Sequence, residues 1–507
     1  MTWSLVLEHL FIVLAASLLS IALGLPLGIL AYVFPQIRKA VLWIVDLLQT
    51  IPALALLGII MVFAGAGKIT VIIGITLYSL LPIVRNTCLG LQEVDPGVKE
   101  AARGMGMSKT YRTLMVEFPL AFPTVFTGIR IAVVNAIGTA VFAAFVGGGG
   151  LGGIINRGIR IADMGLILSG TGALMVIAML LDVLMGRFEK QMRKAKGGSR
   201  NMWIPVALLL AAFVVLLPFG MGTDHGDNEL LLYDGDYSET QIMHHMIKFL
   251  VEDRTGLNVI IQDQMSQVNN FNALIGDNHS CDMMISYDGT LLTTVLGLDP
   301  VDVPEGVSIY EYANQAALEQ HGIRLLEKLG FDNTYAIAVP QHIAEQYGLE
   351  TVSDLIPVAG ELTFGAEHEF FTLEGSMKYG PFTEFYGLHF KGESPVDVSL
   401  KYTAVENGSF EVTEVYATDG LNRKANLKVL EDDKSFFPDY NGAFLVQEDT
   451  FEKFADTAPE LEEILNLLAG QIANEDMVEM TYQVDVMKRT VDEVALEFLT
   501  NRSLLTN

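Results

Sequence analysis

The sequence predicts two kinds of fold in one chain: an all-α membrane part, followed by a water-exposed α/β domain of two lobes. Residues 1–203 hold 17 Lys and Arg against 9 Asp and Glu, whereas the remaining residues hold 15 against 51. Long apolar stretches fill the first part, and alternating strand-like and helix-like stretches fill the second. Because charge and hydropathy change together near residue 222, we expect one part to lie in lipid and the other in water.

The acidic second part argues against nucleic-acid binding, because a phosphate backbone requires a cationic protein surface. The same surplus would favour cationic solutes, although a large acidic surface is more often only a soluble exterior. The two cysteines, Cys88 and Cys281, lie far apart along the chain, so we expect neither a disulfide nor a metal cluster.

Six apolar segments approach the roughly twenty residues that a helix needs to cross the hydrocarbon core. They are residues 10–33, 40–64, 69–84, 120–146, 166–185 and 203–221. The first is too long for a secretory signal and no basic segment precedes it, so we expect a retained span. We therefore expect about five membrane helices within residues 1–200, a tethering helix and linker at 201–228, and the water-exposed domain at 229–507.

Basic residues gather in three loops between these segments. They are Arg38 and Lys39 in the first, Lys99, Arg103, Lys109 and Arg112 in the second, and Lys190, Arg193, Lys194, Lys196 and Arg200 in the third. Basic loops remain on the cytoplasmic side of a membrane, and all three fall there when the N-terminus is outside. With six spans, residues 222–507 are then also outside.

The second basic loop contains a motif of small residues. It reads Glu100-Ala101-Ala102, then Gly106, and closes with Val116-Glu117-Phe118-Pro119. It resembles the coupling loop of ABC-importer permeases, and a likeness to those permeases covers roughly residues 5–195. The small side chains predict a short helix that another protein can approach closely, ended by Gly106, with Pro119 opening the next span. The resemblance implies that Glu100, Ala101, Ala102, Gly106 and Pro119 contact an ATPase; the alternative is an ordinary amphipathic helix.

Two glycine-rich stretches are not expected to bind nucleotides. Residues 65–70 lack the Ser or Thr that a phosphate loop requires directly after its Lys, here Lys68. Residues 147–153 follow a membrane span, where close helix packing or a flexible outer gate explains them better. We expect no nucleotide site, cofactor, metal or catalytic group in this chain. By likeness to the permeases, the ATPase would be a separate subunit and the permease a homodimer.

The acidic part alternates strands and helices. Strands are expected at residues 230–233, 259–261, 283–285, 335–339 and 362–364. Ser238 should begin a helix with Gln241 at its third position, as in a capping box. This alternation predicts parallel sheets, and about 280 residues suit two lobes facing a cleft, where ligands bind at the carboxyl ends of strands.

Six motifs in this part follow the order found in the substrate-binding proteins of quaternary-amine ABC importers, which take glycine betaine, carnitine or choline. They are residues 235–241, 271–274, 287–290, 333–340, 416–420 and 430–440. The fused layout resembles the choline importers of Gram-positive bacteria, where a receptor without a tether would diffuse away. The resemblance implies a type I importer permease in the cell membrane and a periplasmic-binding-protein-like domain outside the cell.

In that family a trimethylammonium group lies in a box of tyrosine rings. By motif match the box here is Tyr287, Tyr335, Tyr416 and Tyr440. A quaternary ammonium has no N–H to donate, so ring faces hold it instead, each contact contributing about 0.5–2 kcal/mol. Any one tyrosine taken alone is more often a core residue, but four of them in four separate motifs favour the box.

The same motifs assign Gln241, Asn333 and Asp419 to the ligand site, the first two as hydrogen-bond partners of the ligand's polar end. Asp288 stands where the broader osmolyte receptors commonly have Thr. Its carboxylate would favour choline and penalise carboxylated ligands, or else it caps the following helix. Residues 367–376 lack the Arg expected for carboxylated ligands. We therefore expect choline import, with glycine betaine, carnitine and ergothioneine as alternatives, and an amine chemoreceptor or an enzyme as readings from other classes.

Overall fold

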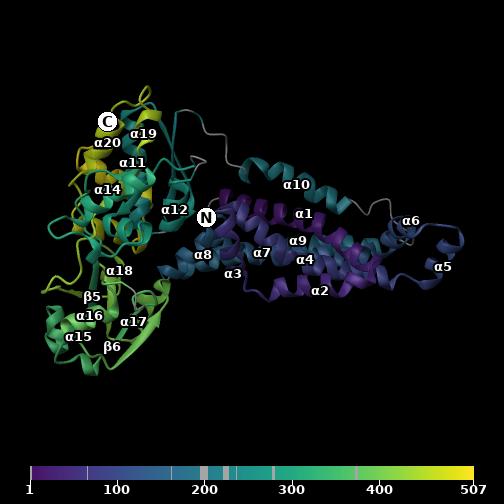
Figure 1. Ribbon diagram of the computed structural model, residues 1–507, viewed down its shortest axis with the longest axis horizontal. Helices are drawn as coiled ribbons and strands as arrows, with labels where there is room; N and C mark the ends of the chain where they lie inside the picture. The colour runs from purple at the N-terminus through teal and green to yellow at the C-terminus, as the bar shows by residue number, and fades with distance from the viewer. Residues whose placement is uncertain are drawn as a thin grey trace. The chain divides into compact units, whose positions relative to one another are not determined.

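The computed structural model describes residues 3–65, 67–161, 163–194, 204–220, 226, 228–235, 237–276, 280–371 and 375–506. The chain divides into two compact units, one of Met1–Ile155 with Gly165–His225 and one of Asn156–Met164 with Gly226–Asn507. Each unit contains its own hydrophobic core. The units are therefore described separately (Figure 1).

The described part of the first unit is helical. Its helices are α1 (Trp3–Val33), α2 (Pro35–Thr50), α3 (Ala53–Ala64), α4 (Lys68–Glu93), α5 (Pro96–Gly104), α6 (Lys109–Arg112), a π-helical turn (Thr113–Glu117), α7 (Phe118–Thr139), a 3-10 turn (Ala140–Val146), α8 (Leu151–Arg160), α9 (Met164–Lys194) and α10 (Ile204–Gly220). Four stretches are long and apolar enough to cross a membrane, namely Leu5–Val33, Lys68–Glu93, Lys109–Val146 and Met164–Met192. They confirm four of the expected spans, and the third is longer than expected.

The expected second span, residues 40–64, is not one continuous helix. It is divided into α2 and α3, which are bent by 100° at Ile51 and Pro52. Ile51 is extended, with φ −71° and ψ 127°, as the ring of a following proline favours. The expected span is therefore bent at Pro52, and the bent pair counts as at most one further crossing.

The expected sixth span corresponds to α10, a helix of 17 residues. Its apolar stretch, Val206–Leu217, is shorter than a usual membrane span. The helix packs on α1, where the rings of Phe11 and Phe213 stack with centroids 5.3 Å apart. Residues 221–225 and 227 of the expected linker, and Lys196 and Arg200 of the third basic loop, lie outside the described residues.

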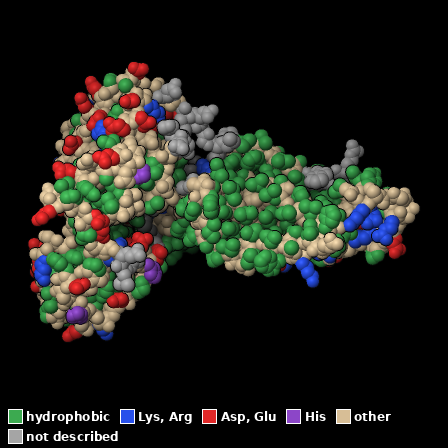
Figure 2. All heavy atoms as spheres, viewed as in Figure 1, with side chains coloured by type: hydrophobic (Ala, Val, Ile, Leu, Met, Phe, Trp, Pro, Cys, Tyr) green, Lys and Arg blue, Asp and Glu red, His purple; other side chains and the backbone are tan. Residues whose placement is uncertain are grey.

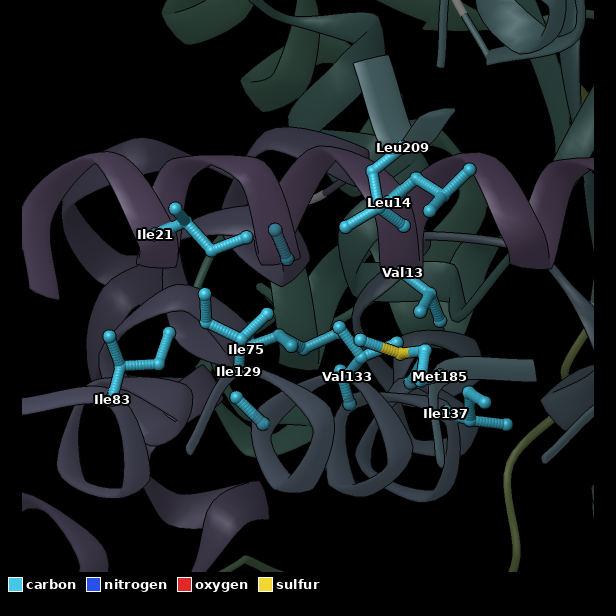
Figure 3. Close-up of a cluster of buried hydrophobic side chains, with 14 of the residues drawn as sticks. Val13, Leu14, Ile21, Ile75, Ile83, Ile129, Val133, Ile137, Met185 and Leu209 are labelled. Carbon is cyan, nitrogen blue, oxygen red and sulfur yellow. The ribbon is translucent and has the colours of Figure 1, made fainter. Parts of the chain in front are cut away.

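The core of the helical unit is formed mainly by α1, α4 and α7. Val13, Ile75 and Val133 are fully buried there, and Leu209 of α10 lies at its edge (Figure 3). Gly128 of α7 permits close packing, because a Cβ at this position would lie 2.5 Å from the carbonyl oxygen of Pro82 in α4. Small residues at such crossings are typical of membrane helices.

Basic side chains bind the carbonyl oxygens that end α1 and α4. Arg38 donates to Ala31 O at 3.0 Å, and Lys109 donates to Val33 O. Lys99 donates to Leu91 O at 2.8 Å. Cations are favourable at helix C-termini. Through these contacts the first two basic loops meet at one end of the unit, far from the N-terminus (Figures 1 and 2).

The second unit alternates strands and helices. Its strands are β1 (Glu229–Gly235), β2 (Asn258–Met265), β3 (Met283–Tyr287), β4 (Ile323–Leu325), β5 (Tyr335–Pro340), β6 (Thr363–Glu367), β7 (Gly392–Val396), β8 (Val412–Tyr416), β9 (Leu427–Leu430) and β10 (Gly442–Gln447). Its helices are α11 (Ser238–Arg254), α12 (Gln267–Leu274), α13 (Asp288–Thr290), α14 (Ile309–His321), α15 (Gln341–Tyr347), α16 (Tyr379–Tyr386), α17 (Lys401–Glu406), α18 (Leu421–Lys424), α19 (Asp449–Lys453), α20 (Leu461–Leu465), α21 (Asn474–Asp485) and α22 (Val491–Asn501). All five expected strands are present.

The sheets are mixed rather than parallel. Strands β1 and β2 pair in parallel, as expected, and so do β6–β7 and β6–β8. Strand β10 pairs antiparallel with both β3 and β4, and β5 pairs antiparallel with both β8 and β9. The prediction of wholly parallel sheets was wrong because β10 and β9 return from late in the chain to complete sheets begun earlier.

Two lobes result, as expected. One holds β1 to β4 with β10, and the other holds the five-stranded sheet β7-β6-β8-β5-β9. The chain passes between them at residues 332–333 and again at 440–441. These two crossings are bonded to each other: Asn333 N donates to Tyr440 O at 3.0 Å, and Tyr440 N donates to Asp332 Oδ1 at 2.6 Å. A pair of adjacent crossing strands is a natural hinge between the lobes.

Candidate functional site

A cavity of about 470 Å³ lies within the second unit and is lined from both lobes. Its size is that of a small-molecule site. Six of the sequence-predicted site residues line it, namely Tyr287, Tyr335, Tyr416, Tyr440, Asn333 and Asp419. The other two, Gln241 and Asp288, are not among its lining residues.

The four tyrosines form two pairs of rings. Tyr335 and Tyr416 face each other across β5 and β8 as register partners, with ring centroids 5.4 Å apart. Tyr287 ends β3, and its ring stacks on that of Tyr440 with centroids 5.8 Å apart. One pair therefore belongs to the second lobe, and the other lies on the first lobe and the crossing. Motion at the crossings would bring the pairs together or apart.

Gly289 makes room for the ring of Tyr440. A Cβ at this position would lie 1.9 Å from Cε2 of Tyr440, a distance that no pair of non-bonded carbons tolerates. The hydroxyls of Tyr440 and Thr290 are 2.9 Å apart and share a hydrogen bond. The segment that follows β3 thus holds Tyr440 in two ways: Gly289 leaves room for the ring, and Thr290 shares a hydrogen bond with the hydroxyl.

All four tyrosines remain neutral phenols at ordinary pH. Burial is the main cause that raises the pKa of Tyr287, Tyr335, Tyr416 and Tyr440 above the ordinary value. Their ring faces carry the negative side of the aromatic quadrupole. A cation that loses its water in this cavity can therefore be stabilised by the rings.

Glu239, in the first turn of α11, also lines the cavity and is 6% exposed. Its carboxylate accepts hydrogen bonds from the hydroxyls of Tyr287 and Thr418, and from Asn333 Nδ2 at 3.0 Å. Burial raises the pKa of Glu239 to about 7, against the effect of these hydrogen bonds. Sequence reasoning did not select this residue, although it lies in the motif at 235–241 after the carboxyl end of β1.

Gln241 does not face the cavity. It is 2% exposed, and its Nε2 donates to Gly235 O at 2.9 Å. The expected capping box is also absent, because Ser238 is the first residue of α11 and donates to Asp485 instead. Gln241 therefore stabilises the turn between β1 and α11, and the assignment as a ligand contact has no geometric support.

Asp288 is buried and is not among the residues that line the cavity. Its two carboxylate oxygens accept from the backbone N and the side-chain Nδ2 of Asn441, each at 2.8 Å, and one also accepts from Gly289 N. Burial raises the pKa of Asp288 to about 6. The carboxylate thus joins the end of β3 to the second crossing, and the structure gives no geometric support to the expectation that it meets the ligand.

Lys401, on α17, carries the one basic side chain among the described residues that line the cavity. It is 1% exposed, and its Nζ donates to Glu367 at 2.8 Å and to Glu414 at 3.0 Å. The same Nζ lies 4.9 Å from the ring centroid of Tyr416. Lys401 lies outside every family motif, so no sequence signal singled it out. Its charge is already matched by two carboxylates.

The charged lining is otherwise acidic, and the lining includes buried acceptors that have no hydrogen-bond partner among the described residues. Glu369, Asp419 and Asp485 line the cavity together with Glu239. Asp419 accepts from the hydroxyl of Tyr402 at 2.7 Å. Asn333 Oδ1 is buried and has no hydrogen-bond partner among the described residues. A buried acceptor without a donor is costly, so a ligand that donates a hydrogen bond would be stabilised at this oxygen.

The motif of the second basic loop lies on α5 and its flanks. The helix begins at Pro96, with Asp95 Oδ1 accepting from Gly97 N at 2.6 Å. Glu100 and Ala101 are exposed and Ala102 is buried. Gly106 follows the helix with φ +77°, and Pro119 lies in the first turn of α7. The exposed edge of α5 thus combines a small side chain with a carboxylate.

Two protein families match this chain, one on each side of the change in composition. Residues 233–501 match the substrate-binding domain of the ABC-type glycine betaine transport system. Residues 20–194 match the inner membrane component of binding-protein-dependent transport systems. Together the two matches account for the membrane helices and for the two-lobed domain.

Curated relatives match either the whole chain or one of its parts. The ergothioneine transport permease/ergothioneine binding protein of Helicobacter pylori (strain G27) is 29% identical over 500 residues, 95% of this chain and 87% of that protein. The carnitine transport permease protein of Listeria monocytogenes is 38% identical over 203 residues, 39% of this chain and 91% of that protein. The carnitine transport binding protein of the same species is 34% identical over 264 residues, 52% and 83% of the two chains. The fused layout thus also occurs outside Gram-positive bacteria.

Solved structures match each part separately. A crystal structure of a glycine betaine/carnitine/choline ABC transporter is 28% identical, with a TM-score of 0.47, over 54% of this chain and 99% of that one. An inward-facing structure of the MetNI methionine ABC transporter is 25% identical, with a TM-score of 0.36, over 38% of this chain and 97% of that one.

Proposed function

Because this chain belongs to the glycine betaine family of binding-protein-dependent ABC importers, with permease and substrate-binding domain in one polypeptide, we propose that it imports choline or a closely related quaternary ammonium compound. The observation that carries the proposal is the cavity lined by Tyr287, Tyr335, Tyr416 and Tyr440, whose charged lining residues other than Lys401 are acidic. Rings hold a methylated ammonium without hydrogen bonds, and the acidic lining favours a net positive charge.

The ion pairs of Lys401 favour a ligand with a net positive charge over a zwitterionic ligand. A carboxylated quaternary amine needs a basic partner when water is removed, because an unpaired charge in a cleft is costly. Lys401 is already bonded to Glu367 and Glu414. This argument replaces the one from Asp288, whose carboxylate is bound to Asn441.

The unmatched Asn333 Oδ1 supports a ligand with a hydroxyl group. Choline can donate its hydroxyl proton to this oxygen, whereas glycine betaine has no donor. Asn333 Nδ2 is bonded to Glu239, so the orientation of the amide is fixed. Asn333 is therefore proposed to meet the polar end of the ligand, as the family motifs imply, and Asp419 remains a proposed member of the ligand site.

Ergothioneine is the second candidate, because the Helicobacter pylori relative that spans nearly the whole chain is an ergothioneine transporter by name. Carnitine and glycine betaine are further alternatives on the same ground of relatedness. All three carry a carboxylate as well as a quaternary nitrogen. They would need Lys401 to exchange one of its present partners for the ligand.

For translocation, we propose that residues 1–200 form the permease, that 201–228 tether the domain, and that residues 229–507 bind the solute outside the cell. The basic end of the helical unit would then face the cytoplasm. Glu100, Ala101, Ala102, Gly106 and Pro119 would contact a separate ATPase subunit there. The permease would work as a homodimer, as in related importers.

The solute is identified by titrating the purified full-length chain with choline, glycine betaine, carnitine and ergothioneine. Choline is expected to bind most tightly, and Tyr335→Ala is expected to weaken its binding by about 2- to 30-fold, the range for losing one aromatic contact of about 0.5–2 kcal/mol. Tyr312→Ala, at a tyrosine of α14 away from the cavity, is the matched control. Tighter binding of a carboxylated amine would reassign the solute.

A further inference from the structure

The position of Glu239 in the ligand cavity distinguishes it from Asp288, a buried carboxylate that is also bonded only to neutral donors. It lines the ligand cavity, and its three hydrogen-bond donors, Tyr287, Asn333 and Thr418, are all neutral. Within the described residues no Lys, Arg or His forms an ion pair with it. By contrast, the buried carboxylate of Asp282 is paired with Lys453 at 2.7 Å. A buried carboxylate without a cation is costly when ionised.

The charged groups around the cavity do not supply the missing cation. Asp419, after β8, adds negative charge that raises the pKa of Glu239, whereas Asp485, on α21, is paired with Arg157 at 3.8 Å. Tyr287 on β3 is held as a neutral phenol. Lys401 on α17 is matched by two carboxylates of its own, Glu367 and Glu414. Glu239 therefore faces the cavity without a cationic partner among the described residues.

We propose that Glu239 is the counter-charge of the bound ammonium, so that capture of a quaternary cation expels a proton from this carboxyl group. The proposal rests on the function proposed above and adds to it a requirement on the ligand: it must be a net cation. Glu239 is bonded to Tyr287 of the ring box and to Asn333 at the crossing. A cation among the rings is thus within the field of the carboxylate.

The pH dependence of the affinity follows from the protonation of Glu239 in the ligand-free protein. Burial raises the pKa of Glu239 to about 7, so without ligand a large fraction of the carboxyl groups holds a proton near neutral pH. A bound cation stabilises the ionised form and lowers the pKa. Affinity must then rise with pH through about 7 and level off above it. Each unit by which the ligand lowers this pKa contributes about tenfold in affinity.

A zwitterionic ligand would behave differently. It brings its own carboxylate, whose negative charge offsets the effect of its ammonium on Glu239. Its binding would therefore expel a smaller fraction of a proton, and its affinity would change less with pH. The strength of the pH dependence thus distinguishes a receptor built for choline-like cations from one built for betaines.

The test is calorimetric titration of the full-length chain with tetramethylammonium chloride and with choline, between about pH 5.5 and about pH 8.5. Two buffers of different ionisation enthalpy, phosphate and Tris, report the protons released by the wild-type chain without any substitution. We expect proton release below about pH 7, and affinity that rises at least about tenfold across the range. Binding with neither proton release nor pH dependence would overturn the proposal.

Two variants identify the titrating group. Glu239→Gln retains an oxygen that can accept hydrogen bonds but cannot lose a proton, so its affinity should be lower at high pH and independent of pH. Asp288→Asn is the control, because Asp288 is also buried with a raised pKa but does not line the cavity; its pH profile should match the wild type. A profile that survives Glu239→Gln, or disappears in Asp288→Asn, assigns the proton elsewhere and refutes the proposal. Failure of the wild type to bind any quaternary amine would refute the proposed function instead.

Discussion

The ring of Tyr440 has room in its place because residue 289 is a glycine. The ring of Tyr440 lies where the Cβ of any other residue at 289 would be, 1.9 Å away. Tyr440 is also held by Asp332 through its backbone N at 2.6 Å. The ring therefore has little freedom to move aside, and one methyl group at residue 289 is enough to disturb the box.

Gly289→Ala is accordingly predicted to weaken choline binding by about tenfold or more, since the displaced Tyr440 ring loses a contact of about 0.5–2 kcal/mol and disturbs its stacking on Tyr287. Equilibrium titration of the full-length variant measures this loss. Gly380→Ala is the matched control, because a Cβ there meets nothing within 4 Å. Equal affinities for the two variants would show that Tyr440 does not contact the ligand.

Sequence motifs located the cavity but did not determine the direction of each side chain. Residues two apart on a helix point to opposite sides, so the motif at 235–241 directs Glu239 to the cavity and Gln241 away from it. Asp288 follows the last residue of β3, where neighbouring side chains alternate between faces, and it points to Asn441. The four tyrosines, each in a separate motif, all line the cavity.

At the scale of elements, two features could not be predicted from the sequence: the break that a single proline makes in a helix, and the pairing of strands that come late in the chain. The apolar run at 40–64 hides a break that Pro52 makes necessary, because the residue before a proline avoids the helical region. Strand β10 pairs with β3 through Gly442 and Tyr287, residues far apart in the sequence, and no local pattern reports such a partner. Strand positions followed from apolar runs, whereas their pairing did not.

Helix α5 permits a test of the proposed contact with the ATPase. Ala101 is exposed on a short helix, so Ala101→Phe should fold normally and leave choline affinity unchanged. A bulky ring at this position would keep a partner helix or groove from approaching. ATP-dependent choline uptake in vesicles that contain the ATPase is predicted to fall at least about tenfold, since a close-packed contact tolerates little added volume.

Normal uptake by Ala101→Phe would remove α5 from the proposed interface. A fall in choline affinity would instead indicate a folding defect, which binding to the detergent-purified chain would reveal. The two measurements therefore separate loss of coupling from loss of the receptor.

At the scale of the whole molecule, composition determines more than any motif does. Apolar side chains cover the helical unit, whereas acidic side chains are scattered over the α/β unit (Figure 2). This division follows from 17 basic against 9 acidic residues before residue 204 and 15 against 51 after it. It could be predicted from sequence alone because solvation depends on composition. Solute choice could not, because it depends on the contacts of a few buried groups such as Lys401 and Asn333.

The central claim is that aromatic rings and an acidic lining select a methylated nitrogen for its positive charge. The most direct measurement compares choline with 3,3-dimethylbutan-1-ol, in which a carbon atom replaces the nitrogen and the shape is retained. At about pH 8, where Glu239 with its raised pKa is mostly ionised, the full-length chain should bind choline at least about a hundredfold more tightly, a difference of about 2.7 kcal/mol. Equal binding of the neutral alcohol would contradict the account.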